Sequence, residues 1–172
     1  MKFTANRQLL AAAFQTVSGV VPARTPKDIL KSVKLEVAYG TATIIGTDQE
    51  IGMRYEVPTV ETEQSGETLL NCGRVSNILR EMTSDEATVE LIDGVVHIVS
   101  PQSHFKLLTQ ATVEFPPVTR FETDRYFMLP VGELKRAIRR TLFATDVEST
   151  RFAMGGILFD IWKDSATFSL AA

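Results

Sequence analysis

Four cations lie within nine residues of this chain, in the stretch GELKRAIRR at positions 132–140. On an α-helix, where successive side chains are about 100° apart, these cations would share one sector of roughly 140°. They are Lys135, Arg136, Arg139 and Arg140. The remaining sector would hold Leu134, Ala137, Ile138 and Leu142. The stretch therefore predicts a helix with an apolar face for packing and a cationic face that could bind anions such as phosphate.

The rest of the chain is acidic, which limits what such a face can do. The 172 residues hold 18 Lys and Arg against 21 Asp and Glu, a net charge of -3. A protein that coats nucleic acid is usually basic overall, so any anion site here must be local. The outward positions of the first predicted helix contain no acid; they are Arg7, Gln8, Ala11, Ala12 and Gln15. The acids lie mostly in predicted strands and turns, so the helices together would offer phosphate a cationic surface.

Catalytic residues in a known arrangement are absent from the sequence. It contains no G-x-S-x-G elbow, no phosphate-binding G-x-x-x-x-G-K-[ST] loop and no H-E-x-x-H pair. Asp48 and Glu50 could form an acid and base pair, but Asp in GTDQE also suits a tight connection between strands. We favour a structural role for both residues in this turn. The alternative is an enzyme, a hydrolase that uses Asp48 and Glu50.

The two histidines and the single cysteine do not predict a metal site. His97 and His104 flank a predicted turn and could approach each other, yet no third ligand accompanies them. We interpret both as ordinary strand positions. Cys72 is the single cysteine, which rules out an intrachain disulfide and is consistent with a reducing compartment. We expect no cofactor.

The elements that would position these residues alternate one helix with three strands, twice. Apolar spacing predicts a first helix over residues 9–17, then strands within 32–58, a second helix over 75–82 and strands within 87–110. Tyr39-Gly40 and Gly46 separate the strands of the first group, and Asp93-Gly94 is typical of a two-residue hairpin turn. These patterns predict an α+β fold of repeated helix-plus-antiparallel-strand units.

A longer repeat becomes visible when the chain is compared with itself at an offset of 124 residues. Phe3 then matches Phe127, Leu10 matches Leu134, and the Ala42-Thr43 pair matches Ala166-Thr167 without a gap. We therefore expect a first domain over residues 1–124 and an incomplete second domain over 125–172. Because the second copy has no third strand, we expect the chain to be a fragment of a longer protein, monomeric by itself.

No apolar run approaches the roughly 18 residues that a membrane span needs, and the N-terminus lacks a signal-peptide core. We expect a cytoplasmic protein without a membrane partner.

Several stretches in order resemble the bacterial DNA polymerase III beta subunit family, the sliding clamps. They are MKFT, VSGVV, Arg24, GTDQE, EFPPV, FMLPVGELKRAI and STRFAMGGILFD. The resemblance implies the DNA clamp fold, with the helices on one face of the sheets. It also implies a head-to-tail homodimeric ring that encircles double-stranded DNA near the nucleoid and has no catalytic activity. Its partners would be a replicative DNA polymerase, a clamp loader and other replication and repair proteins.

The same resemblance assigns roles to individual residues. DNA contacts would come from Arg7, Arg24, Arg80, Lys135, Arg136, Arg139 and Arg140. The ring-closing interface would include Arg74, Ile78, Phe105 and Leu107, although core packing is the alternative for the last three. Met154 would border a pocket for partner peptides, and Glu148 replaces a neutral polar residue that can contact DNA. A stand-alone nucleic-acid-binding adaptor that uses the basic helix is the alternative function.

Overall fold

The computed structural model describes residues 1–120, 122–146, 150, 155–162 and 165–170, the last ten or so of these by backbone alone. The chain divides into two compact units, Met1–Arg120 and Phe121–Ala172, which are described separately here. The division falls four residues before the domain boundary that we expected from the sequence.

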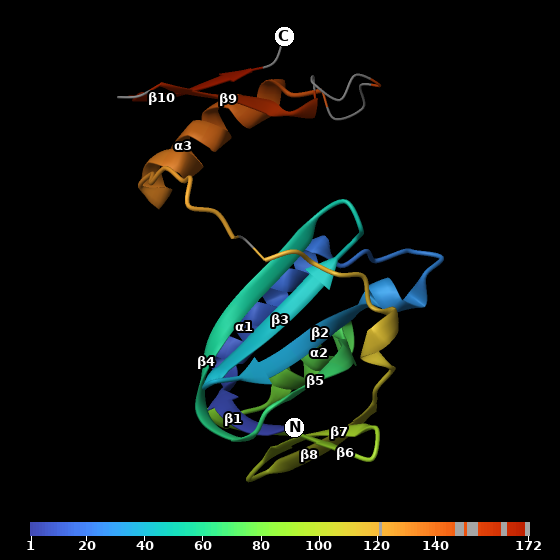
Figure 1. The fold of residues 1–172 in the computed structure, drawn as a ribbon. Coiled ribbons are helices and arrows are strands. Elements are labelled where there is room, and N and C mark those ends of the chain that lie inside the picture. Colours follow the sequence, from blue (N-terminus) through green and yellow to red (C-terminus); the bar gives the residue numbers. More distant parts are fainter. Residues whose placement is uncertain (121, 147–149, 151–154, 163–164, 171–172) are drawn as a thin grey trace. The chain divides into compact units, whose positions relative to one another are not determined.

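The first unit, all of which is described, is one antiparallel sheet with two α-helices (Figure 1). Its strands are β1 (Lys2–Asn6), β2 (Ser32–Ala38), β3 (Thr41–Thr47), β4 (Gly52–Gln64), β5 (Gly66–Asn71), β6 (Glu86–Ile92), β7 (Val95–Ser100) and β8 (Ser103–Leu108). Its helices are α1 (Arg7–Val17) and α2 (Cys72–Glu81), with short 3-10 turns η1 (Ser18–Val20), η2 (Asp28–Lys31) and η3 (Thr112–Glu114). The order in the sheet is β5-β2-β3-β4-β1-β6-β7-β8.

The long strand β4 joins the two halves of this sheet. Its first part pairs with β3 as far as Pro58, and its second part pairs with β1 from Thr59 to Gln64. Each half begins with a strand that ends in an asparagine, and this asparagine caps the following helix. Asn6 Oδ1 accepts a hydrogen bond from the Leu9 amide, and Asn71 Oδ1 accepts one from the Arg74 amide, both at 3.0 Å.

The expectation of three strands in each half is therefore wrong, because β1 and β5 precede the two helices as additional strands. Both had been missed because neither is bounded by a turn signal on the helix side: the strand passes directly into a helix cap. The hairpin turn predicted at Asp93-Gly94 is confirmed, and Tyr39-Gly40 forms a second one. Tyr39-Gly40 and Asp93-Gly94 have φ angles of 51° and 77°, and of 46° and 77°, as the left-handed turn requires.

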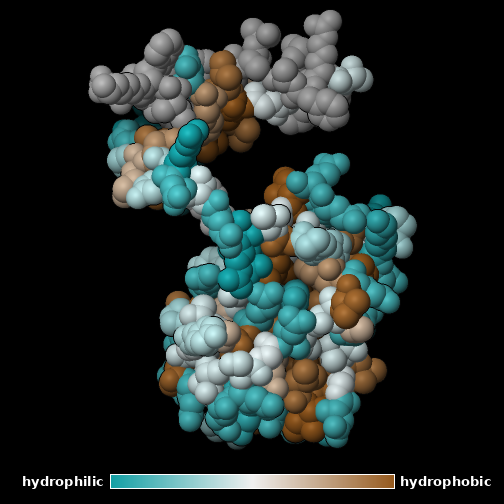
Figure 2. Space-filling model, viewed as in Figure 1, coloured by the Kyte–Doolittle hydropathy of each residue, from teal (hydrophilic) through white to brown (hydrophobic). Residues whose placement is uncertain are grey.

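The core lies between the sheet and its helices, which cover one face (Figure 1). Alternate residues of the strands point into it, such as Phe3 and Ala5 of β1, and α1 contributes Leu10 and Phe14. The α+β fold with helices on one side of the sheet is thus confirmed. In the view of Figure 2, which looks onto the opposite face of this unit, hydrophilic and apolar residues are interspersed.

The sheet nearly closes on itself through Thr109, the residue after β8. The hydroxyl of Thr109 donates to the Leu69 carbonyl at 2.7 Å and accepts from the Leu69 amide at 3.2 Å. Leu69 belongs to β5, at the other end of the strand order. A small second cluster of Ile45, Leu69 and Phe115 then packs the segment after η3 onto the outer face.

The second unit repeats the start of the first at the predicted offset. It contains α3 (Val131–Thr141), the 3-10 turn η4 (Leu142–Ala144) and the antiparallel strands β9 (Ile157–Trp162) and β10 (Ser165–Leu170). The bounds of α3 and η4 are those of α1 and η1 shifted by 124 residues. Among the described residues 122–130, no strand corresponds to β1. At the same offset, the counterparts of its partners β4 and β6 would carry numbers above 172.

Candidate nucleic-acid interface

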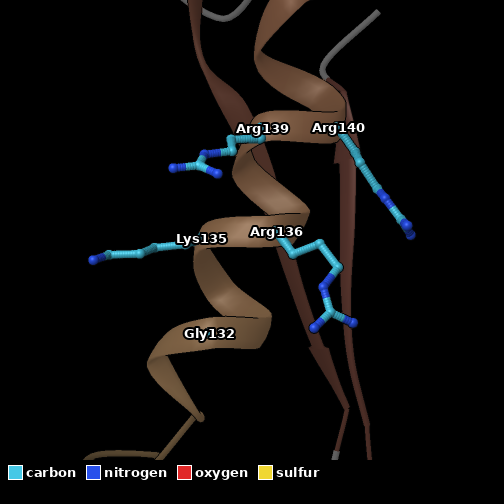
Figure 3. Close-up of a pocket in the computed structure, with 5 residues that line it drawn as sticks. All are labelled: Gly132, Lys135, Arg136, Arg139 and Arg140. Carbon is cyan, nitrogen blue, oxygen red and sulfur yellow. The ribbon is translucent and has the colours of Figure 1, made fainter.

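The four cations of GELKRAIRR lie on α3 and are all exposed, as the sequence predicted. Figure 3 shows them in two rows, with Lys135 and Arg139 pointing to one side of the helix and Arg136 and Arg140 to the other. Gly132 lies one turn earlier and adds no side chain, so the hollow between the rows stays open. The arrangement can hold an anion from two sides.

These rows place like charges at i and i+4 twice, which costs an isolated helix about 0.2–0.5 kcal/mol for each pair. Arg139 and Arg140 recover part of this cost in the last turn, where the helix dipole favours cations. The contact of Arg136 with Glu133, 3.5 Å long and exposed, adds little. The cations therefore add little to the stability of the helix, and their exposed side chains are free to contact an anion.

The opposite face of α3 is only partly covered. Leu134, Ala137 and Ile138 are half-buried, and the helix packs against β10. Leu142, which we had assigned to the apolar face, is 54% exposed. It lies in η4 rather than in α3, and the tighter 3-10 turn rotates its side chain away from that face.

The equivalent surface of the first unit is a groove along α1 and α2 with a different chemistry. It is lined by Arg7, Gln8, Ala11, Ala12, Gln15, Ser76 and Arg80. At the 124-residue offset, Ala11 and Gln15 of this groove correspond to Lys135 and Arg139 of α3. Amide and methyl groups thus occupy in α1 the positions that carry charge in α3.

The three residues of the first unit that were predicted to contact DNA differ in exposure and in the hydrogen bonds that hold their side chains. The half-buried guanidinium of Arg7 donates to the backbone carbonyls of Ser84 and Leu79, at 2.9 and 3.1 Å. Arg80 is exposed and its Nη2 donates to Asn77 Oδ1 at 3.1 Å. Arg24 is exposed in the loop between η1 and η2, outside the groove of Arg7 and Arg80. Arg7 therefore holds two helices together, a role that its sequence position did not indicate.

The predicted interface residues lie on α2 and β8. Arg74 is exposed, whereas Ile78, Phe105 and Leu107 are half-buried and pack against the core. Thr109 contacts β5 just beyond β8, but β8 itself pairs only with β7, so its outer edge has no strand partner within the first unit. Sequence reasoning missed Leu108, which is 87% exposed on the other face of β8. The sequence could have indicated this exposure, because Leu108 follows Leu107 directly and neighbours on a strand point to opposite faces.

Two predicted positions fall where the structure gives no description. Met154, assigned to a partner-peptide pocket, and Glu148 both lie outside the described residues.

The turn interpretation of Asp48 is confirmed. Its carboxylate accepts hydrogen bonds from the amides of Ile51 and Glu50, at 2.7 and 2.9 Å, and these bonds lower the pKa of Asp48. Both bonds end on Oδ1, and a carboxylate with a lowered pKa stays ionised near neutral pH, which suits a turn better than proton transfer. In the described part of the chain, no three His, Cys, Asp or Glu residues are grouped to hold a metal ion. No helix in that part is long and apolar enough to cross a membrane.

Comparison with known proteins agrees with this geometry. The Beta sliding clamp of Escherichia coli (strain K12) is 32% identical over 161 residues, which are 93% of this chain and 44% of that protein. The DNA polymerase III subunit beta from Pseudomonas aeruginosa has a similar crystal structure, with a TM-score of 0.85 and 27% identity, covering 92% of this chain and 43% of that one. A sliding clamp of the same organism bound to griselimycin gives a TM-score of 0.86 at 26% identity and covers 94% and 44%.

The chain thus spans less than half the length of these relatives. The family model for the DNA polymerase III beta subunit, N-terminal domain, matches residues 1–119, which is more than half of the chain. With its two helix-plus-strand halves and its repeated, cation-bearing helix, the chain belongs to the DNA polymerase III beta subunit family.

Proposed function

We propose that this chain is part of a DNA sliding clamp, a non-catalytic ring that encircles duplex DNA and tethers a replicative polymerase. The observation that supports it best is the cationic face of α3, with Lys135, Arg136, Arg139 and Arg140 exposed in a chain of net charge -3. An acidic protein with a concentrated basic helix face attracts phosphate chiefly to that face.

The chemistry of this face suits a contact that slides. Long Lys and Arg side chains reach phosphates without reading base edges, so the contact has no preferred register along the duplex. The amide and methyl groups of the α1 groove would add weak, non-specific contacts, with Arg80 and Arg24 as further cations. Binding by these groups alone would be weak and strongly dependent on salt. Retention would come from the closed ring rather than from affinity.

Ring closure would use β8 and α2. A head-to-tail ring joins two different surfaces, and the open edge of β8 can accept a strand from a second copy. Arg74 is exposed beside it to meet an acidic partner, and Ile78, Phe105 and Leu107 would be covered further on assembly. The full ring would be a homodimer, as the family resemblance implies.

Partner proteins would include the polymerase, a clamp loader and repair factors. A relative from Pseudomonas aeruginosa binds griselimycin, which supports a ligand pocket in the family. We place Met154 at the border of that pocket on the basis of the sequence resemblance, because a flexible thioether suits a socket that accepts several peptides.

The test is retention on DNA circles. The natural gene product that carries residues 1–172 is loaded by its clamp loader onto nicked circular DNA, and the complex is passed over a gel-filtration column before and after linearisation. Co-elution with the circle and release after linearisation would support encirclement. Equal retention on both forms would contradict it and would favour a surface-binding adaptor that uses α3.

A further inference from the structure

The two histidines of the chain are brought together on the last two strands of the sheet. His97 Nδ1 lies 2.8 Å from His104 Nε2, and the ring centroids are 5.1 Å apart. His97 is on β7 and His104 on β8, in a diagonal relationship, because His104 pairs with Val99 and His97 with Lys106. The buried neighbours Val96 and Ile98 point into the core, so both imidazoles stand on the outer face.

The hydrogen bond sets the distance between these nitrogens at 2.8 Å, and this distance is also close to that between two ligands on one metal ion. With metal to nitrogen bonds of about 2.0–2.1 Å, two imidazoles at a right angle would have nitrogens about 2.9 Å apart, and at a tetrahedral angle about 3.3 Å apart. The observed 2.8 Å is nearer to the right angle. Right-angled coordination by imidazole is the preference of Ni²⁺ and Cu²⁺.

We propose that His97 and His104 form a two-histidine chelate for a divalent transition metal of the Ni²⁺ or Cu²⁺ class. No third His, Cys, Asp or Glu completes the group within the described residues, so water would fill the other positions. This inference does not depend on the proposed clamp function.

The proton balance of the site is simple. In the neutral pair, one of the two facing nitrogens carries the proton of the hydrogen bond. Metal binding requires lone pairs on both, so that ring moves its proton to its far nitrogen through solvent, without net release. A pair that carries an extra proton would have to release it, so binding weakens in acid.

The two residues directly opposite His97 on its neighbouring strands carry one charge of each sign, and Lys2 of β1 lies opposite the first of them, Glu90. Glu90 of β6 lies opposite His97 on one side, and Lys106 of β8 lies opposite it on the other. Glu90 favours a bound cation and Lys106 opposes it, so the local field is close to balanced. Replacing Lys106 by Gln should therefore strengthen metal binding, whereas replacing Glu90 by Gln should weaken it.

The test is isothermal titration of the untagged chain with NiCl₂ near neutral pH, beside His97→Gln, His104→Gln and Lys106→Gln. We expect one equivalent of Ni²⁺ in the parent and about a 100-fold weaker affinity in either histidine variant, because a chelate loses its effective concentration. Lys106→Gln, a neighbour on the same face, should bind at least as well as the parent. Equal affinity in a histidine variant and the parent would overturn the proposal.

A spectroscopic measurement identifies the ligands. With one equivalent of CuCl₂, the electron paramagnetic resonance spectrum of the parent should show two imidazole nitrogens, and that of each histidine variant one or none. Circular dichroism of the metal-free variants verifies that they are folded. A parent spectrum with fewer than two imidazoles, from a folded protein, would refute the chelate.

Discussion

Arg7 Nη1 donates a hydrogen bond to the carbonyl oxygen of Leu79, 3.1 Å away, and so joins the first residue of α1 to the last turn of α2. The carbonyls of a last helical turn have no partner within their own helix, and a cation is the favoured donor there. Arg7 Nε binds the Ser84 carbonyl as well, at 2.9 Å. Arg7, which the sequence resemblance assigns to DNA contact, thus also supports the packing between two helices.

Replacing Arg7 by Ala should lower the free energy of unfolding by about 1–3 kcal/mol, because two backbone carbonyls lose a charged donor. Urea unfolding followed by circular dichroism measures the change. Arg80→Ala is the matched control, since that arginine is exposed and should change stability by less than about 0.5 kcal/mol. If the two variants were equally stable, the supporting role of Arg7 would be disproved.

Reversing one row of α3 should weaken DNA retention without unfolding the protein. Lys135→Glu with Arg139→Glu removes the row on one side and changes the net charge by -4. The control, Arg120→Glu with Arg125→Glu, makes the same change in charge at two exposed positions of the segment before α3. We expect at least a tenfold faster loss from nicked circular DNA for the first variant in moderate salt, and near-normal loss for the control. Equal loss from both would mean that overall charge, not this face, governs retention.

Gly46 on β3 allows the close approach of α1. A Cβ at Gly46 would lie 2.5 Å from Val17 Cγ1, well inside contact distance. Gly46→Ala should therefore destabilise the first unit by about 1–3 kcal/mol through overpacking. Gly19→Ala, where a Cβ would meet nothing within 4 Å, should be neutral or slightly stabilising. Thermal unfolding of both variants checks this, and Val17→Ala should rescue the first one in part.

The stability of the outer sheet face should depend on pH through Glu36. Its carboxylate contacts Lys34 at 3.1 Å and Arg54 at 2.9 Å. Burial raises the pKa of Glu36, but these two hydrogen-bonded cations outweigh it and leave the pKa below its ordinary value. The ion pairs therefore stabilise the fold above the ordinary glutamate pKa of 4.5, and this contribution is lost as the pH falls through the lower folded value.

Glu36→Gln should accordingly cost about 1 kcal/mol near pH 7, and the difference from the parent should shrink below about pH 4. Urea unfolding at a series of pH values measures it, with the exposed Glu56→Gln as control. A difference that stays constant down to about pH 3 would be inconsistent with an ionic contribution.

Local chemistry explains which parts of the fold were predictable. The turn at Asp93-Gly94 needs left-handed backbone, which its own residues favour, and the cationic face of α3 follows from helical periodicity alone. The 124-residue repeat was also visible, because α1 and α3 keep the same apolar spacing.

Long-range pairing explains what was missed. β1 is held by β4 and β6, more than fifty residues away, and its alternation of polar and apolar residues covers only five positions. The partners of Arg7 are backbone carbonyls, which no residue type indicates. The nitrogen separation of His97 and His104 depends on the register of β7 and β8, which fixes a diagonal and not a direct pair.

The shared strand β4 also affects how the first unit can come apart. β4 is an interior strand that pairs with β3 as far as Pro58 and with β1 from Thr59, so unfolding either half would leave one part of β4 without its partner strand. Partial opening then has nearly the energetic cost of complete opening, and denaturation should be an all-or-none event. A protein built this way rarely exposes a frayed segment to proteases, which favours a long working life.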